Sequence, residues 1–376
     1  MKAIVNTHLV FTDHILPNAT LLIDGERIVD FGRKLNTDGC EIMDAGGAYT
    51  GPGFVELHTH AARGTFITDN PVLAAKTLLE HGVTDALAAL YFSVGAEELI
   101  RQANTIRAVA GTEQAPNLMG LYMEAPYMNP KFGCNRENNP WRYPINRADY
   151  QPLLEAIGDF AKVWVLAPER EGIEHFAADV LAVNPQAVFA VGHSEASPSQ
   201  IEALLPYGLK LATHHTNATG TLPKYPECRG VCVDEAVWYN DSIYAELICD
   251  KMGIHVDPYM LRLVRKIKGS DRVVLIADSF VDDGPIPEGY DGADDINFDH
   301  MGEISGTKLT MDDACRNMMF NGGASIPECF RYASTNPAAV LGLKDRGKIA
   351  KGMLANLVIT DAEFHVRKVI LRGNVQ

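Results

Sequence analysis

Long apolar runs are missing from this sequence, and nowhere does it hold an uncharged apolar stretch of about 20 residues that could cross a membrane. The N-terminal segment MKAIVNTHLVFTDHILPNA is interrupted by Thr, His and Asp, so it lacks the apolar core of a signal peptide. Close CxxC pairs are also absent, and the seven cysteines form an odd number, which favours free thiols in a reducing compartment. We therefore expect a cytoplasmic protein.

Positive charge is scarce. Lys and Arg number 33 against 48 Asp and Glu, which leaves a formal net charge of −15 and a pI near 5.2. This balance argues against nucleic acid or an anionic membrane surface as the main partner. An anionic small-molecule substrate would need a locally basic pocket.

The chain of 376 residues is long enough for a barrel of about 250 residues with an accessory domain. Its middle part alternates short apolar runs with segments of helical spacing that often end in Gly. Eight such strand-helix units predict an α/β fold, a (β/α)8 TIM-like barrel. The apolar runs are residues 52–60, 84–92, 118–126, 162–169, 187–193, 209–217, 243–256 and 271–279.

Both ends of the chain have a different pattern, that of short alternating strands. Residues 2–49 read this way, and the DG turn at Asp24 and Gly25 favours a hairpin. The last thirty residues show the same pattern of short alternating strands. We therefore predict one small β domain from residues 1–50 plus 344–376, beside a catalytic barrel of residues 51–343.

Six residues with metal-ligand chemistry stand at or just past the ends of apolar runs, where a parallel barrel displays its active site. Taken singly, each has an ordinary explanation, such as a surface His-x-His, an ion pair, a hydrogen-bonded histidine or a helix N-cap. Their joint occurrence at the ends of five strands favours a metal-centred hydrolytic site. The six residues are His58, His60, Glu124, His193, His214 and Asp278.

Such a ligand set leaves a position for water, whose pKa falls to about 7 on zinc. The bound hydroxide then attacks a carbonyl, while Asp278 takes the water proton and returns it to the leaving nitrogen. These six residues are enough to bind one or two divalent ions. Zinc is expected, and iron, manganese and cobalt also suit histidine and carboxylate ligands.

Several longer motifs resemble the amidohydrolase superfamily and, within it, the N-acetylglucosamine-6-phosphate deacetylases. The resemblance covers essentially the whole chain and is specific when the motifs are taken together. They are PGFVELHTH (52–60), YMEAPYMNPKFG (122–133), GHSEA (192–196), THHTNATG (213–220), GIHVDP (253–258), IADS (276–279) and SGTKLTMDDACRNM (305–318).

This resemblance implies a distorted barrel with a β-sandwich built from both termini. It implies Glu124, His193 and His214 as ligands of the principal metal and Asp278 as the catalytic acid and base. The remaining pair, His58 and His60, matches a His-x-His that holds a second ion in some members, with Glu124 as the bridge.

The substrate residues implied by the resemblance are Asn217 and the backbone of Ala218 for a phosphate group, and His255 after the seventh strand. The same resemblance implies a homodimer in which residues of one subunit reach the site of the other.

Two departures from the family pattern concern the substrate. The usual Gly-Ala-His or Gly-Ala-Gln element reads Gly133-Cys134-Asn135 here, so Asn135 is the candidate for the hydrogen bond to the reacting carbonyl. The usual Arg-Glu-Pro-Gly reads PECRG, which shifts the phosphate-binding arginine to Arg229, with Lys224 as a substitute. A phosphate dianion favours a bidentate arginine, so this second change weakens the phosphate hypothesis but does not remove it.

We expect a metal-dependent deacetylase of an N-acetylated amino sugar phosphate, N-acetylglucosamine 6-phosphate above others. The alternatives within the superfamily are N-acetylgalactosamine 6-phosphate, an N-acyl amino acid or a cyclic imide. A non-catalytic barrel homologue is the alternative from another class, but such relatives lose metal ligands and this chain keeps all six.

Overall fold

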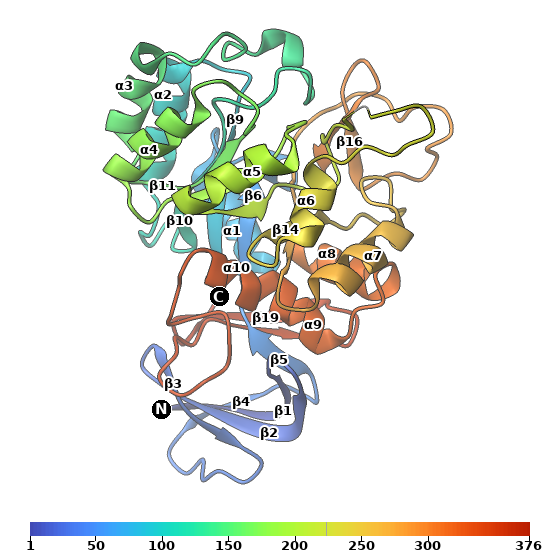
Figure 1. The fold of residues 1–376 in the computed structure, drawn as a ribbon. Helices are drawn as coiled ribbons and strands as arrows, with labels where there is room; N and C mark the ends of the chain where they lie inside the picture. Colours follow the sequence, from blue (N-terminus) through green and yellow to red (C-terminus); the bar gives the residue numbers. More distant parts are fainter. Residues whose placement is uncertain (223) are drawn as a thin grey trace.

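A parallel barrel forms the centre of the computed structural model, which describes residues 1–222 and 224–376 (Figure 1). Its eight strands are ordered β15-β14-β13-β12-β11-β10-β9-β6, and every neighbouring pair is parallel. Apolar side chains fill both faces, as expected for strands covered by helices. The strands are β6 (Phe54–Thr59), β9 (Val83–Tyr91), β10 (Leu118–Glu124), β11 (Ala161–Leu166), β12 (Val188–Val191), β13 (Leu209–Ala212), β14 (Tyr244–Ile248) and β15 (Val273–Ile276).

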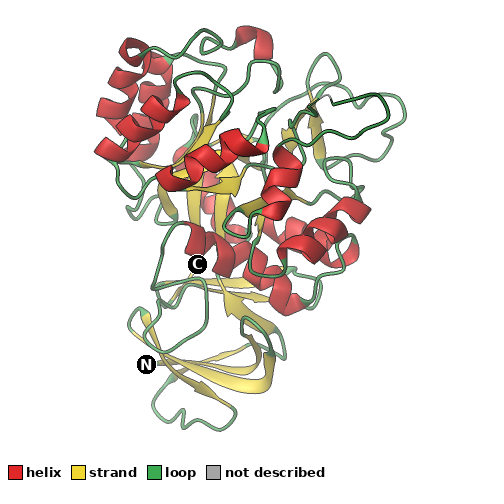
Figure 2. Ribbon diagram, in the orientation of Figure 1, coloured by secondary structure: helices red, strands yellow, loops and turns green. Residues whose placement is uncertain are grey.

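A helix follows each barrel strand, and these helices surround the sheet in Figure 2. Local sequence explains their ends; in α7 the carboxylate of Asp257 accepts from the Tyr259 N–H at 2.7 Å, and Pro258 takes the first position. The alternation confirms the predicted (β/α)8 architecture. The helices are α1 (Pro71–Glu80), α2 (Ala96–Arg107), α3 (Arg147–Ile157), α4 (Ile173–Val183), α5 (Pro198–Leu204), α6 (Val233–Tyr239), α7 (Pro258–Lys268) and α8 (Met311–Phe320).

The barrel closes where its first and last strands meet. The Asp278 N–H donates to the His58 carbonyl at 2.9 Å, and the His60 N–H donates to the Ser279 carbonyl at 2.9 Å. The carboxylate of Glu56 also spans this seam, because it accepts from the N–H groups of His58 and Ala277, each at 3.0 Å. Burial raises the pKa of Glu56 to about 8. Backbone bonds across the seam therefore fix His58, His60 and Asp278 relative to one another.

A second sheet gathers the strands from both termini, which confirms the predicted small β domain; its exact boundaries stay a prediction. Its order is β20-β19-β18-β5-β1-β2-β3, with β4 paired to β1. The predicted hairpin forms, since Asp24 of β2 lies opposite Arg27 of β3. The strands are β1 (Lys2–Val10), β2 (Ile15–Asp24), β3 (Arg27–Gly32), β4 (Glu41–Asp44), β5 (Tyr49–Pro52), β18 (Leu357–Thr360), β19 (Val366–Leu371) and β20 (Asn374–Val375).

The shorter elements lie at the rim of the barrel and beside the small domain. Two of them form the hairpin β16–β17, which follows β15 and lies at the upper right of Figure 1. These elements are β7 (Ala61–Ala62), β8 (Thr65–Phe66), β16 (Ile296–Phe298), β17 (Ile304–Thr307), α9 (Ile326–Phe330), α10 (Asn336–Val340), the 3₁₀ turns η1 (Arg136–Asn138) and η2 (Leu205–Tyr207), and the π-helical turn η3 (Arg331–Thr335).

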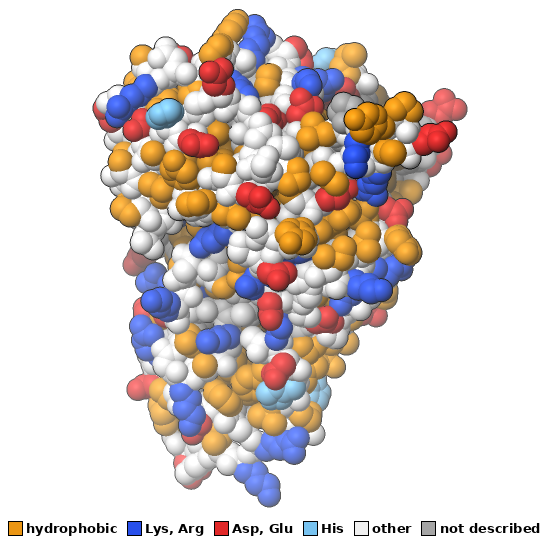
Figure 3. All heavy atoms as spheres, viewed as in Figure 1, with side chains coloured by type: hydrophobic (Ala, Val, Ile, Leu, Met, Phe, Trp, Pro, Cys, Tyr) orange, Lys and Arg blue, Asp and Glu red, His pale blue; other side chains and the backbone are white. Residues whose placement is uncertain are grey.

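Acidic and basic side chains are interspersed on the face shown in Figure 3. Within the described residues, no helix combines the length and apolarity that a bilayer crossing requires.

Candidate metal centre and active-site cavity

The six predicted ligands come together at the carboxyl ends of the barrel strands. His58 lies in β6 and Glu124 ends β10, while the others follow their strands by one or two residues. Three of those that follow a strand have positive φ, namely His193 (46°), His214 (26°) and Asp278 (45°). Left-handed backbone is uncommon for such residues and often marks functional sites.

One cluster joins Glu124, His193 and His214. The Oε1 atom of Glu124 lies 2.8 Å from Nε2 of His193 and 3.0 Å from Nε2 of His214, and the two nitrogens are 2.9 Å apart. Three ligand atoms about 3 Å apart match bonds of about 2 Å to a single zinc-sized ion. All three side chains are buried. This group can therefore hold a metal ion.

A second cluster joins His58, His60 and Asp278 on the other side of the same carboxylate. The Oδ1 atom of Asp278 lies 3.6 Å from Nε2 of each histidine. The Oε2 atom of Glu124 lies 3.1 Å from Nε2 of His60 and 3.5 Å from Nε2 of His58. Each carboxylate oxygen of Glu124 therefore faces a different pair of histidines, which is the arrangement of a bridge between two ions.

The pKa directions of these groups differ. Burial lowers the pKa of His58 and His214, but the carboxylates of Glu124 and Asp278 outweigh burial and raise both above the usual value, so a metal would displace their protons. Burial alone would raise the pKa of Glu124, but the nearby His58 and the hydrogen bonds from His193 and His214 hold it well below its usual range. Burial lowers the pKa of His193, which favours its neutral, ligating form. Both ring nitrogens of His58 are buried without a hydrogen-bond partner among the described residues. A positive ion would satisfy these groups, so the residues present fit a metal.

A polar layer beneath the metal clusters supports them. The Tyr122 ring stacks on His58 with centroids 4.2 Å apart, and its hydroxyl donates to Glu246 Oε2 at 3.0 Å. Glu246 also accepts from the backbone N–H of His214 at 3.3 Å. The neighbouring His215 points away from the clusters, with its ring 6.0 Å from that of Trp238.

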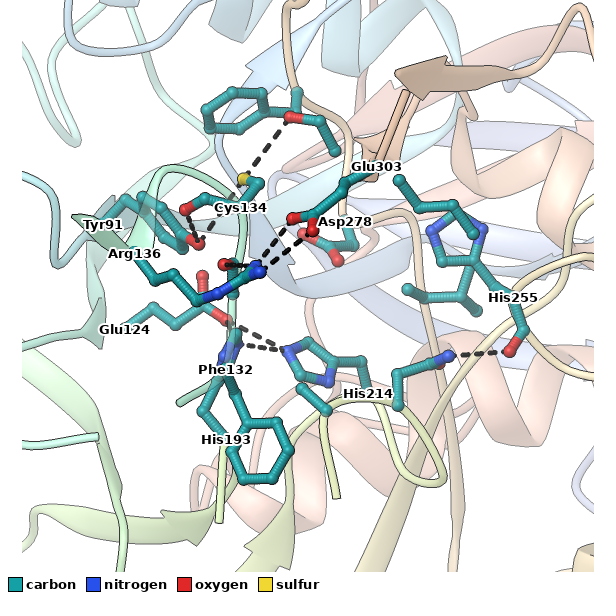
Figure 4. A pocket seen from close by; sticks show the side chains of 18 of the residues that line it. Tyr91, Glu124, Phe132, Cys134, Arg136, His193, His214, His255, Asp278 and Glu303 are labelled. Carbon is teal, nitrogen blue, oxygen red and sulfur yellow. Dashed lines mark hydrogen bonds and ion pairs between the residues drawn. The ribbon is translucent and has the colours of Figure 1, made fainter. Parts of the chain in front are cut away.

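A cavity of about 380 Å³ opens above the clusters. Its lining includes five of the six predicted ligands, with His58 buried below, and the predicted substrate residues Asn217, Ala218 and His255. The Asn217 amide donates to the His255 carbonyl at 2.7 Å, which joins the loops after β13 and β14 (Figure 4).

Two predicted substrate residues do not line the cavity. Arg229 is exposed on the segment before α6, and its guanidinium lies 2.5 Å from the carboxylate of Glu235. Asn135 precedes η1 with a φ of 53°, and its neighbours Cys134 and Arg136 line the cavity without it. The carbonyl contact predicted for Asn135 and the phosphate contact predicted for Arg229 are therefore not brought into the cavity of the same chain, whereas Asn217 and Ala218 do line it.

The cavity lining also includes residues outside the quoted motifs, among them Tyr91, Arg136 and Glu303. Tyr91 ends β9, and its hydroxyl donates to the Cys134 carbonyl at 3.0 Å. From the opposite wall, Glu303 and Ser305 of the hairpin segment reach the cavity, and Glu303 pairs with Arg136. The charged Arg136, directly after the altered Gly133-Cys134-Asn135 element, was the one local signal that could have drawn attention to this wall.

Comparisons with known proteins agree with this geometry. The model of the amidohydrolase family matches residues 236–375. An N-acetylglucosamine-6-phosphate deacetylase of Haemophilus influenzae is 26% identical, with 99% of this chain and 98% of that protein covered. An N-acetylgalactosamine-6-phosphate deacetylase of Escherichia coli O157:H7 is 25% identical, with 86% of each chain covered.

A solved structure extends the likeness to three dimensions. The crystal structure of N-acetylglucosamine-6-phosphate deacetylase from Thermotoga maritima superposes with a TM-score of 0.81 at 26% identity, and 99% of each chain is covered. The barrel, the terminal sheet and the paired metal-ligand clusters thus occur in a chain similar to known hydrolases from end to end. We conclude that this chain is a hydrolase, and that it resembles the amidohydrolase superfamily and, within it, the N-acetylglucosamine-6-phosphate deacetylases over nearly its whole length.

Proposed function

We propose that the enzyme removes the acetyl group from an N-acetylated amino sugar phosphate, namely N-acetylglucosamine 6-phosphate, to give glucosamine 6-phosphate and acetate. The observation that carries the proposal is the pair of metal-ligand clusters that share Glu124 on the floor of the cavity. The named activity of relatives such as the Haemophilus influenzae enzyme supports the choice of substrate.

We propose that Glu124, His193 and His214 hold the principal ion, and that His58 and His60 hold a second with Glu124 between them. Zinc is the expected metal. A divalent cation bound there lowers the pKa of water and polarises the amide carbonyl.

Asp278 is the proposed proton carrier. Its carboxylate stands over the second cluster and lines the cavity, so it can accept the proton of the attacking water. The same group then donates that proton to the sugar nitrogen as the C–N bond breaks.

The proposed substrate contacts are Asn217, Ala218 and His255. Arg229 lies outside the cavity of its own chain, so it would contribute only if a homodimer presents it to the partner's cavity. Light scattering coupled to size exclusion tests the dimer, and Arg229→Ala should raise the KM for the phosphorylated sugar selectively. An equal effect on the unphosphorylated sugar would remove Arg229 from the proposal.

The central test measures acetate release from N-acetylglucosamine 6-phosphate, its galactosamine epimer and unphosphorylated N-acetylglucosamine, on protein of known metal content. We expect turnover of the first that a chelator abolishes and added zinc restores. Faster turnover of the epimer would support the second candidate, which the E. coli O157:H7 relative favours. A metal-loaded protein that acts on none of the three would overturn the proposal.

A further inference from the structure

Few cationic side chains face the cavity. Among the described lining residues, the lysines and arginines are Lys131 and Arg136 alone. The ammonium of Lys131 lies 2.5 Å from the carboxylate of Glu195, and its side chain is largely exposed. The chain is strongly acidic, so recognition of an anionic substrate depends on these local cations.

Arg136 has the more defined geometry of the two. Its Nη1 and Nη2 atoms lie 2.6 and 2.9 Å from the two carboxylate oxygens of Glu303, a bidentate pair across the cavity (Figure 4). Nη1 also donates to the Gly133 carbonyl at 3.2 Å. A further link between the walls is the Ser305 hydroxyl, 3.5 Å from the Cys134 sulfur. These contacts hold the guanidinium of Arg136 in position, with the carboxylate of Glu303 bound to both of its Nη atoms.

That carboxylate is exchangeable. The side chains of Arg136 and Glu303 are 42% and 46% exposed, and ion pairs this accessible contribute little to stability. Glu303 lies in the turn that precedes β17, so it regains water when it leaves the guanidinium. A phosphate dianion carries more charge than a carboxylate and matches the same planar fork. The guanidinium of Arg136 is therefore already oriented to bind an incoming phosphate.

We propose that Arg136 is the residue that recognises the phosphate of the substrate. In this exchange the phosphate replaces the carboxylate of Glu303 on the guanidinium of Arg136. The inference rests on the proposed function for its substrate, but the anion site itself is a property of this cavity. It assigns to Arg136, the first residue of η1, the selectivity that the PECRG segment does not supply within one chain. Glu303 then acts as the group that orients the arginine before the substrate binds.

The test compares R136A, R136K and E303Q with the control R142A, an exposed arginine of the same loop that does not line the cavity. We expect R136A to raise the KM for N-acetylglucosamine 6-phosphate about tenfold or more and to change the value for N-acetylglucosamine less than twofold. R136K should fall between R136A and the wild type, because it keeps the charge but loses the fork. R142A should match the wild type.

A second measurement does not depend on catalysis. Calorimetric titration with inorganic phosphate should show about tenfold weaker binding to R136A, and equal or tighter binding to E303Q. Equal losses on both sugars in R136A, or a loss of phosphate affinity in E303Q as large as in R136A, would overturn the inference. If the wild type deacetylates neither sugar, the proposed function fails, and the phosphate titration still decides the role of Arg136.

Discussion

Asp278 combines two capacities at the scale of a single residue, because it stands within reach of His58 and His60 and also lines the cavity. Asp278→Asn keeps the shape and one oxygen but removes the basic carboxylate. We expect kcat to fall by roughly 10²–10⁴ with metal content unchanged, measured by steady-state kinetics and elemental analysis. Loss of metal in the variant would instead make Asp278 primarily a ligand.

The raised pKa of Asp234 makes the free energy of unfolding depend on pH. Burial raises the pKa of Asp234 at the start of α6 from 3.8 to about 6. The folded chain then binds more protons than the unfolded chain between about pH 4 and 6, so this group's stabilising contribution is full below pH 4 and is lost as the pH rises to about 6.

Asp234→Asn removes that loss. The free energy of unfolding of the variant relative to the wild type should therefore increase by about 1–3 kcal/mol between pH 4 and pH 7. Denaturant titrations of chelator-treated protein measure the difference without contributions from metal binding. The exposed Asp38→Asn is the control and should show no such trend. A constant difference across this range would contradict the pKa assignment.

At the scale of secondary-structure elements, β5 packs closely on the helical turn that contains Phe330. A Cβ atom at Gly51 would lie 2.2 Å from the Phe330 ring, which is itself buried. Gly51→Ala should destabilise the fold by about 1–3 kcal/mol, seen as a lower midpoint in thermal unfolding. Gly32→Ala is the matched control in β3, where the nearest atom is 3.6 Å away. Equal midpoints for the two variants would show that the contact relaxes freely.

The strands, the helices and the six clustered side chains could be predicted because each of these signals is local. An apolar strand that ends in a histidine or carboxylate is visible in a dozen residues, as in VVLIAD, which ends at Asp278. The pair formed by Arg136 and Glu303 joins residues 167 positions apart, and only the folded barrel brings their loops together. Arg229 is the opposite case, in which a local motif predicted a contact that the fold does not form. The motif suggested a substrate contact, but Arg229 pairs with Glu235, six residues away.

The whole molecule depends on the junction between the barrel and the terminal sheet. Asp85 of β9 forms an ion pair with Arg346 and accepts from the Asn356 amide at 3.1 Å, at a site where the Asp85 side chain is 5% exposed. Removal of one partner from a buried pair leaves the other charge without compensation.

Arg346→Ala should therefore lower the free energy of unfolding by about 2–4 kcal/mol, measured by denaturant titration. Lys351→Ala breaks an exposed pair with Asp30 and should cost less than about 1 kcal/mol. Similar losses in the two variants would show that the junction does not depend on Asp85.

The pairing of β5 has a consequence for biosynthesis. One edge of β5 binds β1 early, but the other edge waits for β18 near the end of the chain. During translation the barrel residues emerge before that partner, so the N-terminal strands are left with an open edge until β18 leaves the ribosome. A nascent or prematurely terminated chain would offer that edge to other chains, which makes aggregation the expected fate of C-terminal truncations.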